Sequence, residues 1–156
     1  MEKKELEFLK ESNAIEGVFD DDSLEQAKYA WEYLKEQKEI GIGVILKTHK
    51  MLMLNQHLYP DQIGYFRKVD VTIGGRNGMN IWDIRPYMEE WVKKANEDKR
   101  WTDIRISHVA YEFCHPFVDG NGRTGRMFLN WARLKNGMKI KVIKAKDRLK
   151  YYQWFN

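Results

Sequence analysis

The chain has 156 residues, of which 43% are hydrophobic and 13% aromatic, enough to build the core of one domain. It contains three prolines, which argues against a long disordered segment. The charged first residues lead into no apolar signal region, and the longest apolar run, Ile40–Leu46, is too short to span a bilayer. The simplest expectation is a soluble, cytoplasmic protein that does not contact membranes.

The formal net charge is +4, and the sequence contains no run of five or more basic residues. We therefore interpret the lysines and arginines as scattered over solvent-exposed helix faces, and we expect no nucleic-acid partner. The single cysteine, Cys114, cannot form an internal disulfide and is expected in the core.

Helical periodicity dominates the chain and predicts a mainly helical fold in one domain, residues 1–156. The acidic cluster Asp20-Asp21-Asp22-Ser23 is typical of a helix N-cap, Asp103 starts a further helical pattern, and Gly17 is placed to end the first helix. The predicted helices cover approximately 5–17, 20–34, 44–54, 82–95, 103–113, 127–134 and 147–155.

One segment, about 69–82, differs from this pattern. Val69, Val71 and Ile73 alternate with polar residues, and the pair Gly74–Gly75 follows. This pattern predicts a β-hairpin whose return strand extends to Trp82. An isolated hairpin is only marginally stable, so we expect it to lean on the helices.

Residues 115–126 read His-Pro-Phe-Val-Asp-Gly-Asn-Gly-Arg-Thr-Gly-Arg and carry the clearest chemistry in the chain. Pro116 should end the preceding helix and leave the ring of His115 facing a cleft, as a candidate general base. Asp119 is a hard oxygen ligand suited to Mg²⁺. The glycines after it permit a backbone that points amide groups at an anion, and guanidinium groups suit phosphate oxygens.

This stretch resembles the signature of the Fic (Fic/Doc) family, His-x-Phe-x-Asp/Glu-Gly-Asn-Gly-Arg-x-x-Arg. The residues that match are His115, Phe117, Asp119, Gly120, Asn121, Gly122, Arg123 and Arg126. The surrounding helices and hairpin also agree with the family from about residue 40 onward.

The resemblance implies a protein adenylyltransferase that transfers AMP from ATP to a Ser, Thr or Tyr hydroxyl of a protein, which could be the chain itself. His115 would remove the hydroxyl proton, and Asp119 would hold Mg²⁺ between the α- and β-phosphates. Arg123 would bind the β-phosphate and Arg126 the γ-phosphate. The nucleotide-binding residues are expected to be Gly120, Asn121, Gly122, Arg123, Thr124, Gly125, Arg126 and Tyr152.

Two further features follow from the resemblance. The hairpin residues Val71, Thr72, Ile73 and Gly74 resemble the flap that docks a target backbone as an added strand. Doc-like kinases carry Lys where Gly122 stands, so Gly122 favours AMP transfer over phosphorylation.

Residues 12–17, Ser-Asn-Ala-Ile-Glu-Gly, resemble the family's inhibitory helix motif, carried here by Ser12, Glu16 and Gly17. Ser12 and Glu16 lie one helical turn apart, on one face. Glu16 would pair with Arg126 and take the place of the γ-phosphate, so that ATP binds only in a non-productive pose.

Several alternatives stay open. The same site could remove AMP from modified proteins, with Glu16 orienting a water, or it could be a non-catalytic nucleotide-binding module of a toxin–antitoxin system. His108, Glu112 and His115 share a helix face but lack a common zinc spacing. Self-association that holds the first helix is common in the family, so a homo-oligomer is a further expectation.

Overall fold

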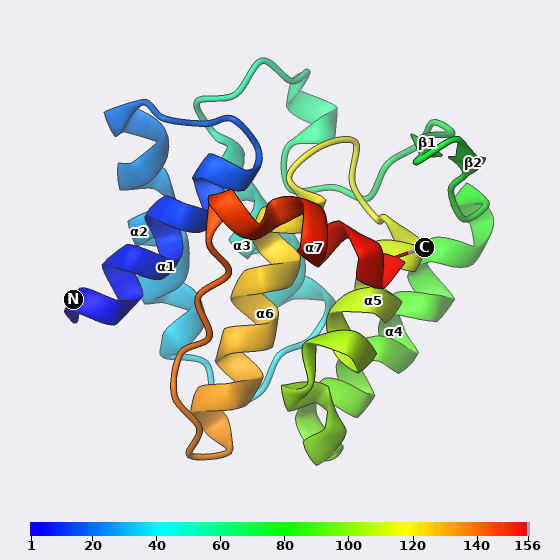
Figure 1. Ribbon diagram of the computed structural model, residues 1–156. Helices are drawn as coiled ribbons and strands as arrows, with labels where there is room; N and C mark the ends of the chain where they lie inside the picture. Colours follow the sequence, from blue (N-terminus) through cyan, green and yellow to red (C-terminus); the bar gives the residue numbers. More distant parts are fainter. Residues whose placement is uncertain (156) are drawn as a thin grey trace.

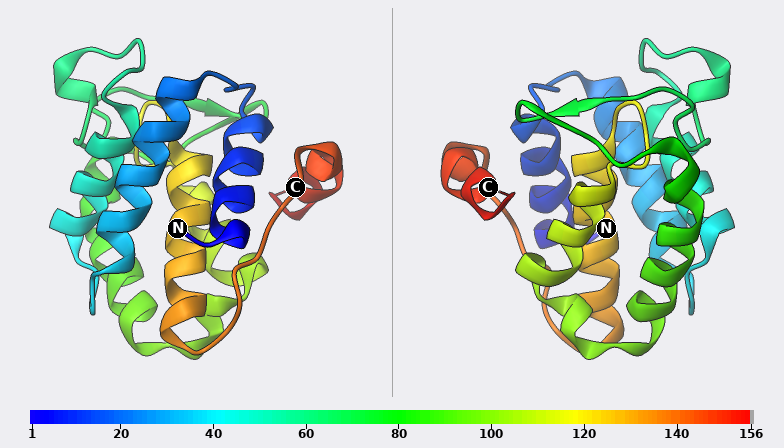
Figure 2. Two further views of the ribbon diagram at one scale, coloured as in Figure 1. Left: turned by 90° about the vertical axis from the view of Figure 1, so that its left-hand side faces the viewer. Right: turned by 90° about the vertical axis from the view of Figure 1, so that its right-hand side faces the viewer.

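Helix α6 (Asn121–Lys135) lies at the centre of the fold, with the other helices packed around it (Figures 1 and 2). In the computed structural model, which describes residues 1–155, 11 of the 15 residues of α6 are buried. A helix that is buried on nearly every side must be enclosed by other elements. This central position places the start of α6, where the glycine-rich loop ends, inside the molecule.

Helices α1, α2, α3 and α5 contact α6 directly, and α4 packs against α3 and α5. A short helix, α7, crosses the outside near the C-terminal end (Figure 1). The bounds are α1 (Lys3–Ile15), α2 (Asp21–Lys35), α3 (Ile42–Met53), α4 (Ile81–Glu97), α5 (Ile104–Cys114) and α7 (Arg148–Tyr152). Short 3₁₀ turns lie at Pro60–Gln62, Lys99–Thr102, Ala145–Asp147 and Gln153–Phe155.

Helix ends follow the capping residues that the sequence predicts. The Asp20 carboxylate accepts a hydrogen bond from the Ser23 amide (2.9 Å), and Asp103 accepts one from the Arg105 amide (2.9 Å). Helix α1 ends in a Schellman motif, in which Gly17 has φ +71° and the Val18 amide donates to the Asn13 carbonyl (3.0 Å). This motif ends the helix at the residue before Glu16.

The hairpin pairs β1 (Thr72–Ile73) with antiparallel β2 (Arg76–Asn77). Gly74 and Gly75 both have positive φ, +54° and +83°, as a two-residue hairpin turn with the right twist requires. The predicted return strand to Trp82 is wrong, because Asn80 instead caps α4 by accepting a hydrogen bond from the Trp82 amide (3.0 Å). The side chain of Asn80 satisfies an amide at the start of a 17-residue helix, and a longer strand at an exposed edge would have given up this bond.

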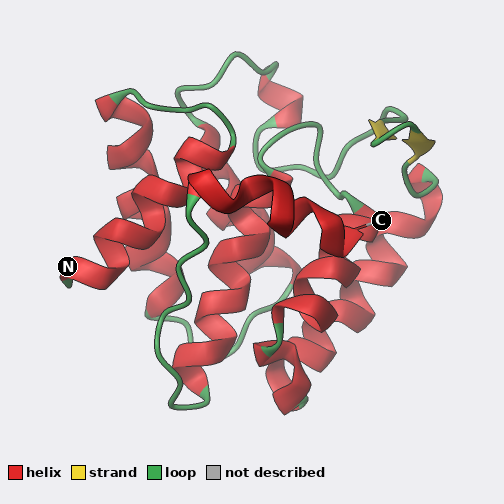
Figure 3. Ribbon diagram, in the orientation of Figure 1, coloured by secondary structure: helices red, strands yellow, loops and turns green. Residues whose placement is uncertain are grey.

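The mainly helical class with a small hairpin is confirmed, and Figure 3 shows how little of the chain is strand. Cys114 is fully buried, as expected, and burial raises the pKa of its thiol to about 12. Within residues 1–155, no helix combines the length and the apolar character that a bilayer crossing would need.

Candidate functional site

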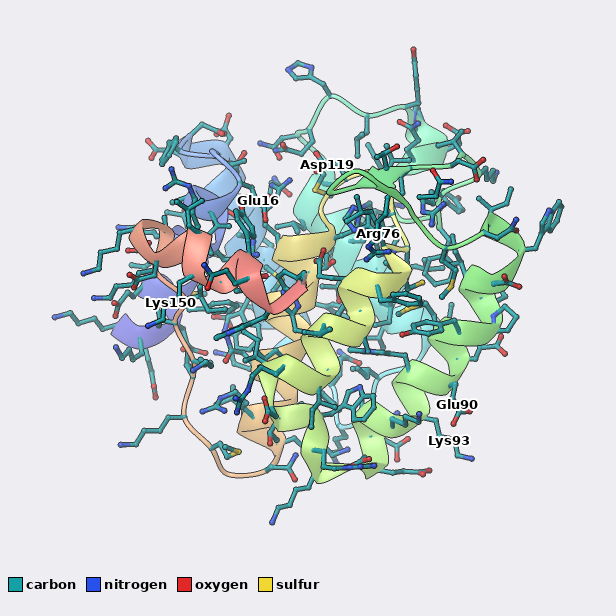
Figure 4. The ribbon with its side chains drawn as sticks, turned by 45° about the vertical axis from the view of Figure 1, so that its right-hand side comes forward. Glu16, Arg76, Glu90, Lys93, Asp119 and Lys150 are labelled. Carbon is teal, nitrogen blue, oxygen red and sulfur yellow. The ribbon has the colours of Figure 1, made fainter. Side chains whose placement is uncertain are left out.

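A cavity of about 570 Å³ opens between α1, the hairpin, α5, the glycine-rich loop and the C-terminal turns. This volume is in the range of small-ligand sites. Figure 4 labels three residues that line this cavity, namely Glu16 just past the end of α1, Asp119 in the loop and Arg76 in the hairpin. The cavity lining includes the charged or ionisable side chains of Glu16, Arg76, His115, Asp119, Arg126 and Tyr152.

His115 is the C-cap of α5 and lines this cavity, as predicted from the position of Pro116. Its backbone is left-handed, with φ +51° and ψ +64°, which is uncommon for a residue with a side chain. The amide donates to the Tyr111 carbonyl at 3.0 Å, so the last turn of the helix holds this conformation.

Glu112 lies one turn before His115, and its Oε2 is 3.4 Å from His115 Nδ1. Burial opposes ionisation of Glu112, but the neighbouring His115 ring and the Arg126 charge outweigh burial and hold the Glu112 pKa below its usual value. A carboxylate beside Nδ1 favours the neutral tautomer that carries its proton on this nitrogen, although at 3.4 Å the two side chains form no hydrogen bond in this structure. From the sequence, Glu112 was a candidate for helix packing and support of the site, with a metal ligand as the alternative.

Three side chains hold the loop between His115 and α6. The Asn121 side chain accepts from the Phe117 amide (2.9 Å) and donates to the Phe117 carbonyl (2.8 Å). The Phe117 ring stacks on the ring of His49, with centroids 3.7 Å apart. The side chain of Asn121 thus stabilises the loop, although the residue also borders the cavity.

His49 is a loop contact that the sequence gave no reason to expect. Its Nδ1 accepts a hydrogen bond from the Gly64 amide (2.9 Å), so Nε2 carries the proton and donates to the Asp119 carbonyl (2.8 Å). Burial lowers the pKa of His49 to about 4, which keeps the ring neutral and this tautomer in place.

The N-terminus of α6 forms one wall of the cavity. Gly120 has φ +84°, and a side chain there would meet the sulfur of Met53. The first helical hydrogen bond runs from the Thr124 amide to the Gly120 carbonyl (3.0 Å), so the amides before it have no partner within the helix. Such amides bind anions, and Gly120, Asn121 and Gly122 all line the cavity.

Arg126 is buried and bound on three sides. Its Nε donates to Ser12 Oγ (2.8 Å), and its Nη2 donates to the Ser12 carbonyl (3.0 Å) and to Glu16 Oε1 (2.8 Å). Nη1 donates to the Tyr151 hydroxyl at 3.0 Å. The Arg126 guanidinium is therefore already paired with a carboxylate.

Gly122 lies directly beneath this pair. A Cβ at this position would clash with Glu16 Oε1 and would lie 2.9 Å from Arg126 Nη1. The ion pair can close over the start of α6 because residue 122 has no side chain.

Arg123 is buried, and its Nη2 lies 3.8 Å from Asp119 Oδ2. Its Nε and Nη1 have no hydrogen-bond partner among residues 1–155. Two unpaired buried guanidinium nitrogens beside the free helix amides fit a phosphate group. Asp119 is 60% exposed, and its Oδ1 accepts from the Gly120 amide (2.8 Å), so it offers oxygen toward solvent where a divalent cation could bind.

Val71 and Thr72 of the hairpin lie outside the cavity lining, and the other predicted residues occupy two settings. Ile73, Gly74 and Tyr152 line the cavity. Thr124 and Gly125 are in the interior, where the Thr124 hydroxyl contacts that of Tyr111 (2.7 Å) and a Cβ at Gly125 would lie 2.6 Å from His108 Nδ1. Their positions suit helix packing, and their predicted contact with nucleotide stays a prediction.

His108 contacts the Tyr151 hydroxyl through Nε2, and Tyr151 in turn accepts from Arg126. Burial lowers the pKa of His108 to about 4. The same histidine that the sequence offered as a metal ligand is thus the end of a neutral hydrogen-bond chain that supports Arg126.

A sequence model of the Fic/DOC family matches residues 42–132, more than half of the chain. The chain belongs to the Fic/DOC family. The Fic match includes the hairpin, His115 and Arg126 but not α1 or α7, which supply the residues bound to Arg126.

Curated relatives called Protein adenylyltransferase Fic, from Drosophila persimilis and Drosophila melanogaster, are each 30% identical to the chain over 132 residues. These matches cover 81% of the chain but 26% of each relative, so the chain spans about a quarter of their length.

Two solved structures share the fold. A Fic domain containing signaling protein from Bacteroides thetaiotaomicron matches with a TM-score of 0.82 at 18% identity, covering 97% of the chain and 70% of that protein. Fic-1 from C. elegans matches with a TM-score of 0.80 at 22% identity, covering 98% and 55%.

The two neutral histidines predict a stability that depends on pH. Their pKa is about 4 in the folded chain and about 6.5 otherwise, so the unfolded chain binds more protons between these values. The contribution of these histidines to the free energy of unfolding should be fully present above pH 6.5 and should be lost as the pH decreases toward 4. Between pH 7 and pH 5, each histidine should lower the free energy of unfolding by about 2 kcal/mol.

Urea unfolding at pH 7 and pH 5 checks this expectation. A His49→Gln variant should lose about half of the pH dependence, whereas His57→Gln, at an exposed position, should retain all of it. If the pH dependence of His49→Gln equals that of the parent, His49 is not held neutral in the folded chain.

Proposed function

We propose that this Fic-family chain transfers AMP from ATP to a hydroxyl side chain of a protein, and that Glu16 restrains this activity. One observation carries the proposal: His115, Asp119, the free amides of α6 and the tip of the hairpin all border a single cavity. The names of the Drosophila relatives support the same reaction.

The phosphate end of ATP would lie against the start of α6. The free amides around Gly122 and the unpaired nitrogens of Arg123 supply donors for phosphate oxygens. Asp119 would hold Mg²⁺, which would neutralise phosphate charge when bound. Tyr152, 39% exposed on the same cavity, offers a ring beside which the base could lie.

The transfer itself needs a base, an acceptor and a leaving group. Nε2 of His115 would take the proton of the acceptor hydroxyl while its oxygen forms a bond to the α-phosphorus. The bond from that phosphorus to the bridging oxygen breaks, and pyrophosphate leaves with the electron pair. Glu112 would stabilise the charge that develops on the His115 ring.

The acceptor protein would reach His115 by pairing with the hairpin. The β1–β2 ladder has two residue pairs, and Ile73 and Gly74 border the cavity. Backbone pairing at this edge would bring a side chain of the added strand toward the base. Backbone contacts read little sequence, so target choice would depend on other surfaces.

Restraint would come from competition for one cation. Arg126 is almost fully buried and holds Glu16 at 2.8 Å, so a terminal phosphate must displace this carboxylate to reach the guanidinium. Glu16 is about one third exposed and lies at the end of α1, where displacement would require little rearrangement of the core.

Replacing Glu16 tests the restraint. Glu16→Gly should raise AMP transfer by at least about tenfold, which corresponds to about 1.4 kcal/mol. Glu16→Gln, which keeps the shape but not the charge, should fall between this variant and the parent. Labelled ATP, with the chain itself and a lysate as acceptors, provides the measurement.

The matched control is Glu36→Gly, because Glu36 is an exposed glutamate at the C-cap of α2 and should leave transfer unchanged. Equal labelling by the parent and by Glu16→Gly would refute the restraint. Loss of AMP from a modified acceptor would instead favour the reverse reaction.

Removing the base tests the chemistry. His115→Ala in the Glu16→Gly background should reduce transfer by about 10²–10⁴-fold while ATP still binds. His57→Ala, at an exposed position, should have no effect. Transfer that survives in His115→Ala would show that another group is the base.

Glu112→Gln tests how the base is oriented. An amide beside His115 Nδ1 neither stabilises an imidazolium nor fixes the tautomer, so turnover should fall by about 10- to 100-fold with ATP affinity retained. Glu89→Gln, on the exposed face of α4, serves as the control. Undiminished turnover in Glu112→Gln would exclude the carboxylate from this role.

A further inference from the structure

Arg67 connects the hairpin to the loop that carries His115. Its Nε donates to the His115 carbonyl (2.7 Å) and its Nη2 to the Cys114 carbonyl (3.3 Å). Its other contacts go to the two ends of the hairpin segment, from Nη1 to the Val69 carbonyl (3.0 Å) and from Nη2 to the Met79 carbonyl (2.5 Å). One side chain therefore binds both segments that border the cavity.

The backbone of Arg67 reinforces the connection, since its amide donates to the Pro116 carbonyl at 2.9 Å. Arg67 is 3% exposed, and within residues 1–155 it has no carboxylate at ion-pair distance. A buried cation is costly unless its donors are satisfied, and here carbonyl oxygens satisfy them. Burying a charge opposes folding, so stability alone does not explain this arginine. The position of the hairpin relative to His115 offers a reason for it.

The contacts reach the part of α5 that most needs support. Cys114 and His115 end the helix, where carbonyls lack partners within the helix and carry partial negative charge. His115 is also the residue with the left-handed backbone. Binding its carbonyl restrains the direction in which the imidazole leaves the chain.

The same guanidinium fixes the base of the hairpin. A Cβ at Gly78 would lie 3.1 Å from Arg67 Nη2 and 2.8 Å from a methyl carbon of Val71. The Gly78 amide donates to the Val71 carbonyl at 2.8 Å. The guanidinium is thus packed below the start of the ladder and binds a carbonyl on each of the two segments that lead into it.

We propose that Arg67 is a positioning residue that sets the distance and angle between a strand docked on the hairpin and the His115 ring. The proposal rests on the proposed transfer reaction, because it assumes that the acceptor docks on the hairpin. A misplacement of about 1 Å between reacting groups can cost about 10²-fold in rate. Arg67 would touch neither nucleotide nor acceptor and would act through His115 and the hairpin.

The test compares Arg67→Met and Arg67→Lys with Lys68→Met, which removes the exposed neighbouring cation. All are made in the Glu16→Gly background. Arg67→Met should lower turnover by about 10²-fold and leave ATP affinity within about twofold. Arg67→Lys should be intermediate, because an ammonium group cannot reach all four carbonyls.

A second readout does not depend on turnover. Amide hydrogen exchange at Gly78 and at position 67 should become at least about tenfold faster in Arg67→Met, and the NMR signal of the His115 ring should shift. Lys68→Met should change neither. If Arg67→Met does not fold, Arg67→Lys decides by the same measurements.

The proposal is overturned if Arg67→Met has the same turnover, amide exchange and His115 signal as Lys68→Met. It is also overturned by a loss of ATP affinity equal to the loss of turnover, since that indicates a general structural role. If the Glu16→Gly parent transfers no AMP to any acceptor, the proposed function fails by itself. Exchange and the His115 signal then still establish or refute the link between hairpin and base.

Discussion

The contacts of the Arg126 guanidinium govern the arrangement of the site. A buried cation must have partners, and those of Arg126 come from Ser12 in α1, from Glu16 just past its end, and from Tyr151 in α7. These elements lie at opposite ends of the chain and meet over the start of α6 (Figure 1). Since Glu16 is the only carboxylate that the described residues place on Arg126, any other anion in the cavity has to compete with it.

The remainder of the loop is held by contacts that leave its anion-binding groups free. His49 and Asn121 bind backbone atoms of the loop, and Phe117 anchors it in the core. The amides at the start of α6 and two nitrogens of Arg123 have no such role. A loop with its own backbone fixed and its donors unused is organised in advance for a charged ligand, which lowers the cost of binding.

The hairpin is supported differently. Its ladder has two residue pairs, its turn residues are exposed, and Arg67 supplies contacts at its base. This gives the cavity one rigid wall, α6, and one wall that depends on few interactions. A wall of the second kind suits an edge that must accept another strand.

Local sequence was enough for most of the architecture. Apolar spacing located the helices, Asp20 and Asp103 marked two of their starts, and Gly74–Gly75 marked the hairpin turn. The return strand was misplaced because Asn80 was read as part of a ladder, although a helix cap was the stronger use of it. Such competition between two local uses of one residue is decided by the packing of α4, which no short window contains.

The sequence by itself determined the family and the residues of the glycine-rich loop, because these lie within twelve consecutive positions and their chemistry depends on their order. It also located Ser12 and Glu16 one turn apart. Only the tertiary structure decided what surrounds them: that His49 holds the loop, that Glu112 faces His115, that Tyr151 supports Arg126, and that Arg67 joins the hairpin to the base. Each of these contacts unites residues from different turns or elements, and a buried polar group reveals its partner only when packing has removed water from both.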